Sequence, residues 1–132
     1  MNIAVSEFSG EGMSRVYENR KWMVGIKNWK PANDITGIDC LERHNETDET
    51  FVLLSGHCTL IYANEEAGGL DVRAVVMEPF KVYTIPAALW HNTVTRRDTK
   101  MMLIEDSATG QANSDVMTLS PDQIAEVQKL AG

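Results

Sequence analysis

Histidines and glutamates are the residues of this 132-residue chain whose types suit metal or acid–base chemistry. Glu42 and His44 stand two residues apart, so their side chains share one face of an extended segment. Glu49 follows His44 after the polar turn 45–48, and it faces His44 only if the chain reverses there and places the two on neighbouring strands. His91 lies far along the chain, where a closed barrel would bring it opposite the other three.

Imidazole and carboxylate groups together are typical ligands of a divalent transition metal. They bind Zn, Mn, Fe, Co or Ni without a thiolate, and they leave positions open for water or a substrate. Carboxylates that face each other without a metal repel, so metal binding should stabilise the fold. We predict a divalent metal site formed by Glu42, His44, Glu49 and His91. Glu42 has two possible roles, as a ligand or as the catalytic base that moves a substrate proton.

Short apolar segments with a period of two predict the strands that must position these residues. The expected extended segments are 22–26, 35–44, 49–55, 58–62, 72–77, 81–85, 92–96 and 101–105. Turn residues separate them about every 8–12 residues, which is typical of an all-β sandwich or small barrel. The absence of alternating strands and long helices disfavours an α/β sheet.

The two ends of the chain differ from this pattern. We expect residues 1–20 to form a loose N-terminal arm with at most one turn, and residues 21–132 to form a single domain, because one domain commonly takes ~100–200 residues. The segment Ser120-Pro121-Asp122-Gln123 has the pattern of a capping box with proline at the first helical position. It predicts a short amphipathic helix over 121–131, which packs on the barrel or on a partner.

The spacing of the candidate ligands resembles the two sequence motifs of the cupin superfamily, G(X)5HXH(X)3-4E(X)6G and G(X)5PXG(X)2H(X)3N. Five positions match: His44, Glu49, Gly56, Pro86 and His91. Five differ: Thr36, Phe80 and Ala88 replace glycine, Glu42 replaces histidine, and Thr95 replaces asparagine. The resemblance implies a small jelly-roll β-barrel of the cupin type, in which His44, Glu49 and His91 bind a divalent metal and Glu42 occupies the fourth ligand position.

The resemblance also implies chemistry on a small polar ligand such as a sugar or an organic acid. Metal-dependent isomerase or lyase activity fits a site of two imidazoles and carboxylates. Dioxygenase activity is less favoured, because Glu42 replaces the third imidazole. The alternative is a non-catalytic ligand-binding protein or a structural dimer, with or without metal, since a fold alone does not fix a function.

Four further residues are candidates for the substrate pocket. Phe51 follows the inward parity of Glu49, and Tyr83 offers a hydroxyl. Trp90 is next to His91, and Arg96 could bind a carboxylate or phosphate in a bidentate manner. The aromatic residues could equally belong to the core or the rim. The third histidine, His57, matches no motif position, and we expect it in a turn or on the surface.

Charge and composition limit the partners. The 12 basic residues against 19 acidic ones give a net charge of -7, which argues against nucleic acid or an anionic membrane as the main partner. No apolar run approaches the ~20 residues of a membrane span, and the first ten residues lack the pattern of a signal peptide. Two cysteines do not make a disulfide scaffold. We therefore expect a cytoplasmic protein that binds a small molecule and forms a homodimer, through the arm, Trp29 or the helix.

Overall fold

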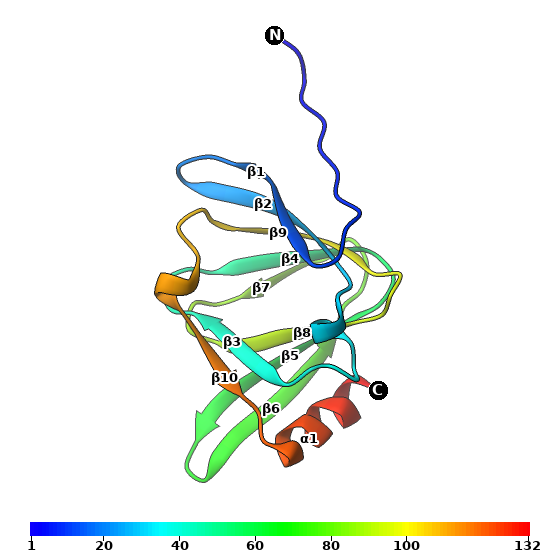
Figure 1. The fold of residues 1–132 in the computed structure, drawn as a ribbon. Coiled ribbons are helices and arrows are strands. Elements are labelled where there is room, and N and C mark those ends of the chain that lie inside the picture. The colour runs from blue at the N-terminus through cyan, green and yellow to red at the C-terminus, as the bar shows by residue number, and fades with distance from the viewer.

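The computed structural model describes residues 1–132 as two facing antiparallel sheets, which confirms the predicted all-β jelly-roll architecture (Figure 1). The first sheet has the order β1 (Met13–Glu18), β2 (Trp22–Asn28), β9 (Lys100–Asp106), β4 (Glu49–Ser55), β7 (Val82–Ile85). The second has the order β10 (Ser114–Thr118), β3 (Cys40–His44), β8 (Trp90–Thr95), β5 (Cys58–Glu66), β6 (Gly69–Val76). The short 3-10 turns Pro31–Asn33 and Gln111–Asn113 and the helix α1 (Pro121–Ala131) complete the chain.

Two strands lie where the sequence did not predict them. Residues 13–18 were expected to belong to a loose arm, but they form β1 and pair with β2 along the edge of the first sheet. Strand β10 pairs with β3 at the edge of the second sheet. Both edge strands are mostly polar or half-exposed, so they lack the clear alternation that marks the inner strands.

Two apolar cores hold these layers together. The first fills the space between the sheets and includes Met23, Leu53 and Met101, each 0–1% exposed. The second lies between the outer face of the second sheet and α1, which runs beside β6 (Figure 1). Val127 of the helix is fully buried there, whereas Leu130 is 40% exposed. The predicted helix thus packs on its own barrel, through a face that does not include Leu130.

The Ser120 side chain accepts a hydrogen bond from the backbone N–H of Gln123 and caps this helix, as its capping box predicts.

Left-handed backbone conformations occur at three of the four glycine positions that the cupin motifs specify. Gly56 has φ +80, and a Cβ there would lie 2.5 Å from the Cα of Thr99. Phe80 and Ala88 have φ 66 and φ 69, although neither is glycine. The chain therefore keeps these two turns at the expense of backbone strain.

The helix α1 packs on β5 and β6 of the second sheet, and the outer face of the first sheet is left partly exposed. Two rows of paired side chains point outward there. One joins Val24, Ile104 and Thr50, and the other joins Ile26, Met102, Val52 and Val82. No helix of the protein is long and apolar enough to cross a membrane.

Candidate metal centre

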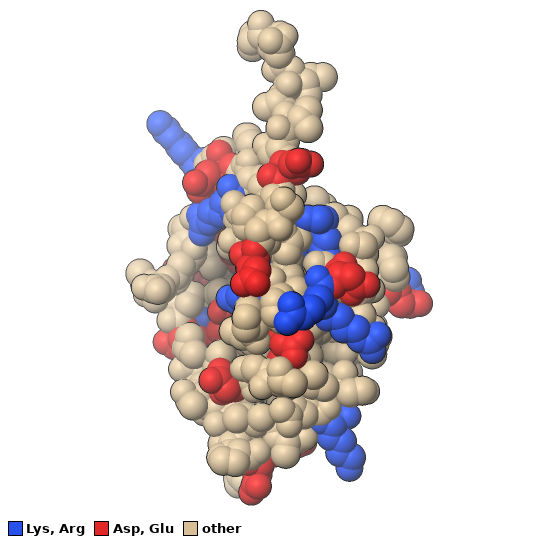
Figure 2. All heavy atoms as spheres, turned by 45° about the vertical axis from the view of Figure 1, so that its right-hand side comes forward, with Lys and Arg blue, Asp and Glu red and all other residues tan.

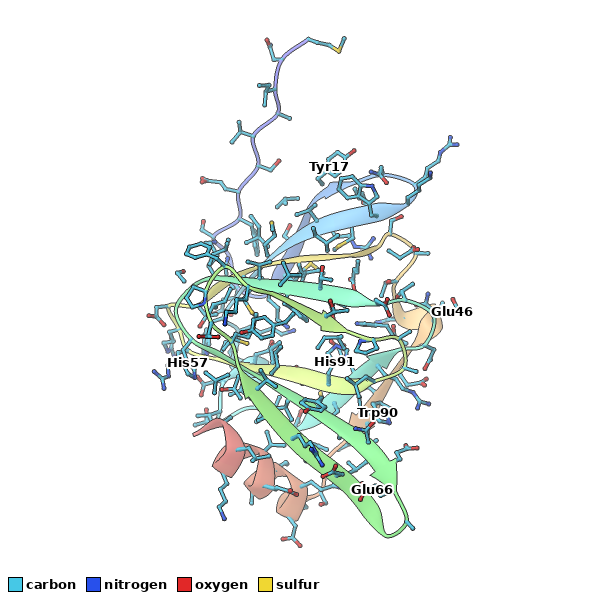
Figure 3. All side chains as sticks on the ribbon, turned by 180° about the vertical axis from the view of Figure 1, so that it is seen from behind. Tyr17, Glu46, His57, Glu66, Trp90 and His91 are labelled. Carbon is cyan, nitrogen blue, oxygen red and sulfur yellow. The ribbon has the colours of Figure 1, made fainter.

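Two rows of paired residues face each other inside the barrel and form a cluster of ionisable side chains. In the first sheet, Glu49 of β4 lies directly opposite Glu105 of β9. In the second sheet, Glu42 of β3 pairs with His91 of β8, and His44 follows two residues after Glu42. Figure 3 shows His91 in the space between the sheets. The register of the strands thus brings together the four residues that the spacing singled out, which lie on β3, β4 and β8.

The cluster is tight. The Nε2 atom of His91 lies 3.1 Å from Oε1 of Glu49 and 3.9 Å from Oε1 of Glu42. The Nε2 atom of His44 lies 3.6 Å from the same Glu49 oxygen and 3.9 Å from Oε2 of Glu105. Two groups of three residues could each hold a metal ion, Glu42–His44–His91 and His44–Glu49–Glu105. Within each group, the three ligand atoms lie within 4.8 Å of one another. Both sets have the spacing and the chemistry of a transition-metal site.

The hydrogen bonds of the imidazoles aim their Nε2 atoms into the cluster. The Nδ1 atom of His91 lies 2.9 Å from the carbonyl oxygen of Leu89, which can only accept, so Nδ1 carries the proton. In a neutral ring, Nε2 then presents a lone pair to the Glu49 carboxylate. Two acceptors 3.1 Å apart require a cation between them, either a second proton or a metal ion. His44 is held on its Nδ1 side by the Ser114 hydroxyl at 2.8 Å.

The charges of the cluster are strongly coupled. Burial would raise the pKa of Glu49, but the two imidazoles that face it outweigh burial and lower that pKa to about 2. The Glu49 carboxylate in turn raises the pKa of His44. Burial, together with the charge of Glu49, raises the pKa of Glu105 to about 8. The carboxylate pair of Glu49 and Glu105 therefore carries one negative charge at neutral pH.

Glu105 is the member of the cluster that sequence reasoning missed. Its Oε2 atom is buried and has no hydrogen-bond partner, as expected of an atom that awaits a cation. A signal was present, because Glu105 shares the inward parity of the buried residues Met101 and Leu103. An acidic residue at a core position of a strand calls for a partner. The unpaired oxygen and the mixed imidazole and carboxylate donors fit a divalent ion.

A cavity of about 520 Å³ leads to the cluster. It is lined by residues of β1 and β10, the two unpredicted strands, together with Glu42, His44 and Glu105. The side chain of Glu42 is 41% exposed, so it is the most accessible carboxylate of the cluster. Arg15 of β1 fixes the rim, because its guanidinium donates to the carbonyl oxygens of Ser107 and Thr109 at 3.0 and 2.6 Å.

None of the four residues expected to line the pocket, Phe51, Tyr83, Trp90 and Arg96, contributes to this cavity. Phe51 is buried in the core between the sheets, and Tyr83 lines a separate apolar hollow of about 250 Å³. Trp90 precedes His91 in β8 and therefore lies on the opposite face, where Arg43 stacks 4.4 Å from its ring centroid (Figure 3). Arg96 is exposed and lines another hollow, together with His57.

Comparison with known proteins shows a shared fold and little shared sequence. No family model matches the chain, and no curated protein matches it. Among solved structures, Streptomyces Pac13, described as a nucleoside dehydratase, is 13% identical with a TM-score of 0.61, over 88% of this chain and 87% of that one. The protein has the cupin fold.

Two further cupin-fold comparisons support this conclusion. KdgF from Halomonas sp. is 12% identical with a TM-score of 0.53, over 71% of this chain and 76% of that one. A cupin superfamily protein from Desulfitobacterium hafniense DCB-2 is 14% identical with a TM-score of 0.52, over 74% of this chain and 81% of that one. Likenesses at this level of identity establish the fold alone.

Proposed function

We propose that the protein is a metal-binding cupin that performs isomerase or lyase chemistry on a small polar ligand, such as a sugar or an organic acid. The observation that carries this proposal is the contact between His91 and Glu49, in which the imidazole Nε2 atom and a carboxylate oxygen lie 3.1 Å apart. His44, Glu49 and His91 would together hold a divalent ion. The unpaired Oε2 atom of Glu105 supports the same assignment.

The residues of the site have distinct roles in this proposal. A divalent ion, when bound by these residues, would supply Lewis acidity to a carbonyl or hydroxyl oxygen of the ligand. Glu42 reaches both the cluster and the cavity, so it is the group placed to take a proton from the ligand. Glu105 lies 3.9 Å from the Nε2 atom of His44 and supports the ligand set. The polar lining of the cavity, which includes Arg15 and Ser114, favours a hydroxylated or charged ligand.

The similar folds fit this class of chemistry without fixing it. Pac13 is described as a nucleoside dehydratase, and dehydration is a lyase reaction. A hydroquinone 1,2-dioxygenase from Sphingomonas sp. TTNP3 shares the architecture at 7% identity with a TM-score of 0.55, over 75% of this chain and 68% of that one. Dioxygenase chemistry is less favoured here, because two imidazoles and three carboxylates form the cluster.

Elemental analysis of the purified protein tests the proposal. We expect about one equivalent of Mn, Fe, Co, Ni or Zn in the wild type and its loss in His44→Ala and His91→Ala, because each variant removes one ligand. His57→Ala is the matched control, since His57 lies outside the cluster and should keep the metal. A wild type that stays free of metal after divalent ions are added would favour the alternative, a non-catalytic ligand-binding cupin.

We further propose that the protein forms a homodimer and resides in the cytoplasm. The outward rows of the first sheet offer an apolar face, and its exposed members include Val82 at 68% and Ile104 at 40%. The N-terminal arm starts at the end of this face, where Asn28 donates to the carbonyl oxygens of Phe8 and Gly10. Beyond this anchor, the arm extends away from the barrel (Figure 1).

The apolar residues of the arm explain why a second copy is the partner we propose. Ile3 and Val5 are 93% and 91% exposed and have no contact with their own barrel that would cover them. A second copy would bury both the arm and the sheet face, in a symmetric arrangement where each arm lies on the other barrel. For the location, the two free cysteines, Cys40 and Cys58, fit a reducing compartment.

A further inference from the structure

A lysine inside the barrel has no partner in the cluster described above. Lys27 of β2 shares the inward parity of Met23 and Gly25, and its side chain therefore points into the space between the sheets. It takes part in none of the side-chain hydrogen bonds or ion pairs of the structure, and no carboxylate oxygen lies within 4.0 Å of its ammonium group. Lys27 is half-buried, and a partly desolvated ammonium group is a favourable partner for an anion.

Lys27 lines a small hollow next to the main cavity. The hollow has a volume of about 100 Å³, and a second lysine, Lys30, also lines it. Glu42 and Val116 line both the hollow and the 520 Å³ cavity, so Glu42 stands between the two spaces. Imidazoles and carboxylates lie on one side of Glu42, and the two lysines lie on the other.

Burial is the largest influence on Lys27. It lowers the pKa of Lys27, while Glu49 and Glu42 act in the opposite direction and Lys30 has a smaller lowering effect. Neither carboxylate forms an ion pair with Lys27, so an anion in direct contact with its ammonium group would offset the cost of burial.

We infer that Lys27 and Lys30 form a carboxylate-binding subsite, which makes an organic acid the ligand of the Glu42 cavity. The inference rests on the proposed function and selects the acid over the neutral sugar. A carboxylate in the hollow leaves the neighbouring carbon of the ligand beside Glu42, at the entrance to the cluster. A 2-hydroxy acid or a 2-oxo acid has its reactive oxygen on that carbon. The hollow has a volume of about 100 Å³, so it suits a single carboxylate group better than a sugar ring.

Ligand titrations followed by NMR test this inference with two small probes. Glycolate and glycolamide have nearly the same shape, but only glycolate carries a charge. We expect the wild type to bind glycolate at least about tenfold more tightly, since a charge-assisted pair contributes roughly 1.5–3 kcal/mol. Lys27→Met should remove most of this preference, and Lys30→Met should reduce it less, because Lys30 is exposed. Lys27→Arg should retain it, because the cation remains.

The control and the metal state complete the design. Lys81→Met is the matched control, because Lys81 is exposed and pairs with Glu78 away from the cavity. Each titration is run with a chelator and with added Mn²⁺. Equal affinity for the two probes, no binding of either, or a preference that survives in Lys27→Met would each overturn the subsite. A preference that disappears with the chelator would assign the carboxylate to the metal and would also overturn it.

The test of the carboxylate subsite can fail independently of the test of the metal site. A protein that holds no metal but prefers glycolate through Lys27 retains the subsite and loses the metal chemistry. A protein that holds its metal but binds glycolate and glycolamide equally retains the metal chemistry and loses the subsite.

Discussion

Glu49 is the residue on which the site is centred, because both imidazoles face the same carboxylate oxygen, at 3.1 and 3.6 Å. Its cross-strand partner Glu105 is held in the neutral form by this arrangement, since the pKa of Glu105 is raised to about 8. Without a metal, the two carboxyl groups and the two imidazoles share protons, and the pKa of each group depends on the charge of the others. The stability of the metal-free protein should therefore depend on pH through Glu105.

The variant Glu105→Gln measures this dependence. In the unfolded chain Glu105 ionises near its ordinary value of 4.5, whereas in the folded chain it keeps its proton up to about pH 8. The folded state thus binds more protons in this range, and stability falls as the pH rises from about 4.5 to 8. The amide of the variant cannot ionise and removes this loss, so we expect the variant to gain on the order of 4 kcal/mol at pH 8.

Urea unfolding in the presence of a chelator, at pH 5 and pH 8, checks this expectation. The difference between the variant and the wild type should be small at pH 5 and larger at pH 8. A variant that is less stable than the wild type at both values would show that the Glu105 carboxyl stabilises the metal-free fold.

Residue spacing predicted the four candidate ligands because period two and the two motifs both report which face of a strand a side chain occupies. The same rule explains why Trp90 was misplaced, since a residue adjacent to His91 in an extended strand must face the other way. Glu105 was not predicted as a site residue, because its strand does not belong to either motif. Lys27 was not predicted for the same reason, and the pairing of β2 with β9 shows that it points inward.

At the scale of elements, two turns next to the motif strands contain backbone strain, because non-glycine residues adopt positive φ there. The turn at 86–89 matters for the site, because the N–H of Ala88 donates to the carbonyl oxygen of His44 at 2.7 Å. Ala88 adopts φ 69 to do so, in a position where the cupin motif has glycine. The turn therefore fixes the end of β3 while it holds an alanine in a left-handed conformation.

Replacing this alanine should stabilise the protein. We expect Ala88→Gly to raise the free energy of unfolding by about 1 kcal/mol, because glycine adopts positive φ without the clash of a Cβ atom. Phe80→Gly, at φ 66 and 76% exposed, should behave in the same direction. Denaturant unfolding measures both variants, and a loss of stability in Ala88→Gly would contradict the argument.

Gly56→Ala supplies the opposite control for the turns. Gly56 also has positive φ, but an added Cβ would lie 2.5 Å from the Cα of Thr99, so both strain and a backbone clash should destabilise the variant. Gly68→Ala separates the two effects, because Gly68 has φ +93 and open space around its Cα. It should lose only about 1 kcal/mol, the cost of strain alone.

The inner strands were predictable from alternation, and the edge strands were not. Strand β4 has the bounds Glu49–Ser55 that the sequence indicated, because Phe51 and Leu53 bury one side of it. Strand β10 consists of residues that are largely half-buried or exposed, and its pairing with β3 depends on contacts about 70 residues apart. Those contacts, which form one wall of the cavity, are a property of the folded chain and not of any local pattern.

At the scale of the whole molecule, charge and apolar surface are distributed unequally. Basic and acidic side chains are interspersed over the face shown in Figure 2. The outer face of the first sheet is different, because its two central rows are almost entirely apolar. Stable dimers commonly bury about 800 Å² on each partner, and the exposed arm adds to the area that this face offers.

The dimer we propose should depend on Ile104, the residue at the centre of this face. Ile104→Lys places a charge between Val24 and Thr50, so association would bury an unpaired ammonium group, and we expect the variant to be monomeric. Light scattering coupled to size exclusion should give the wild type twice the 14.7 kDa of one chain and the variant a single chain. Val76→Lys is the matched control, because Val76 is 56% exposed on β6 of the other sheet, and it should remain dimeric.

Deletion of residues 2–9 should weaken association without abolishing the fold, since those residues have few contacts with their own barrel. A wild type of one chain mass at micromolar concentration would overturn the dimer and leave the sheet face without its proposed partner.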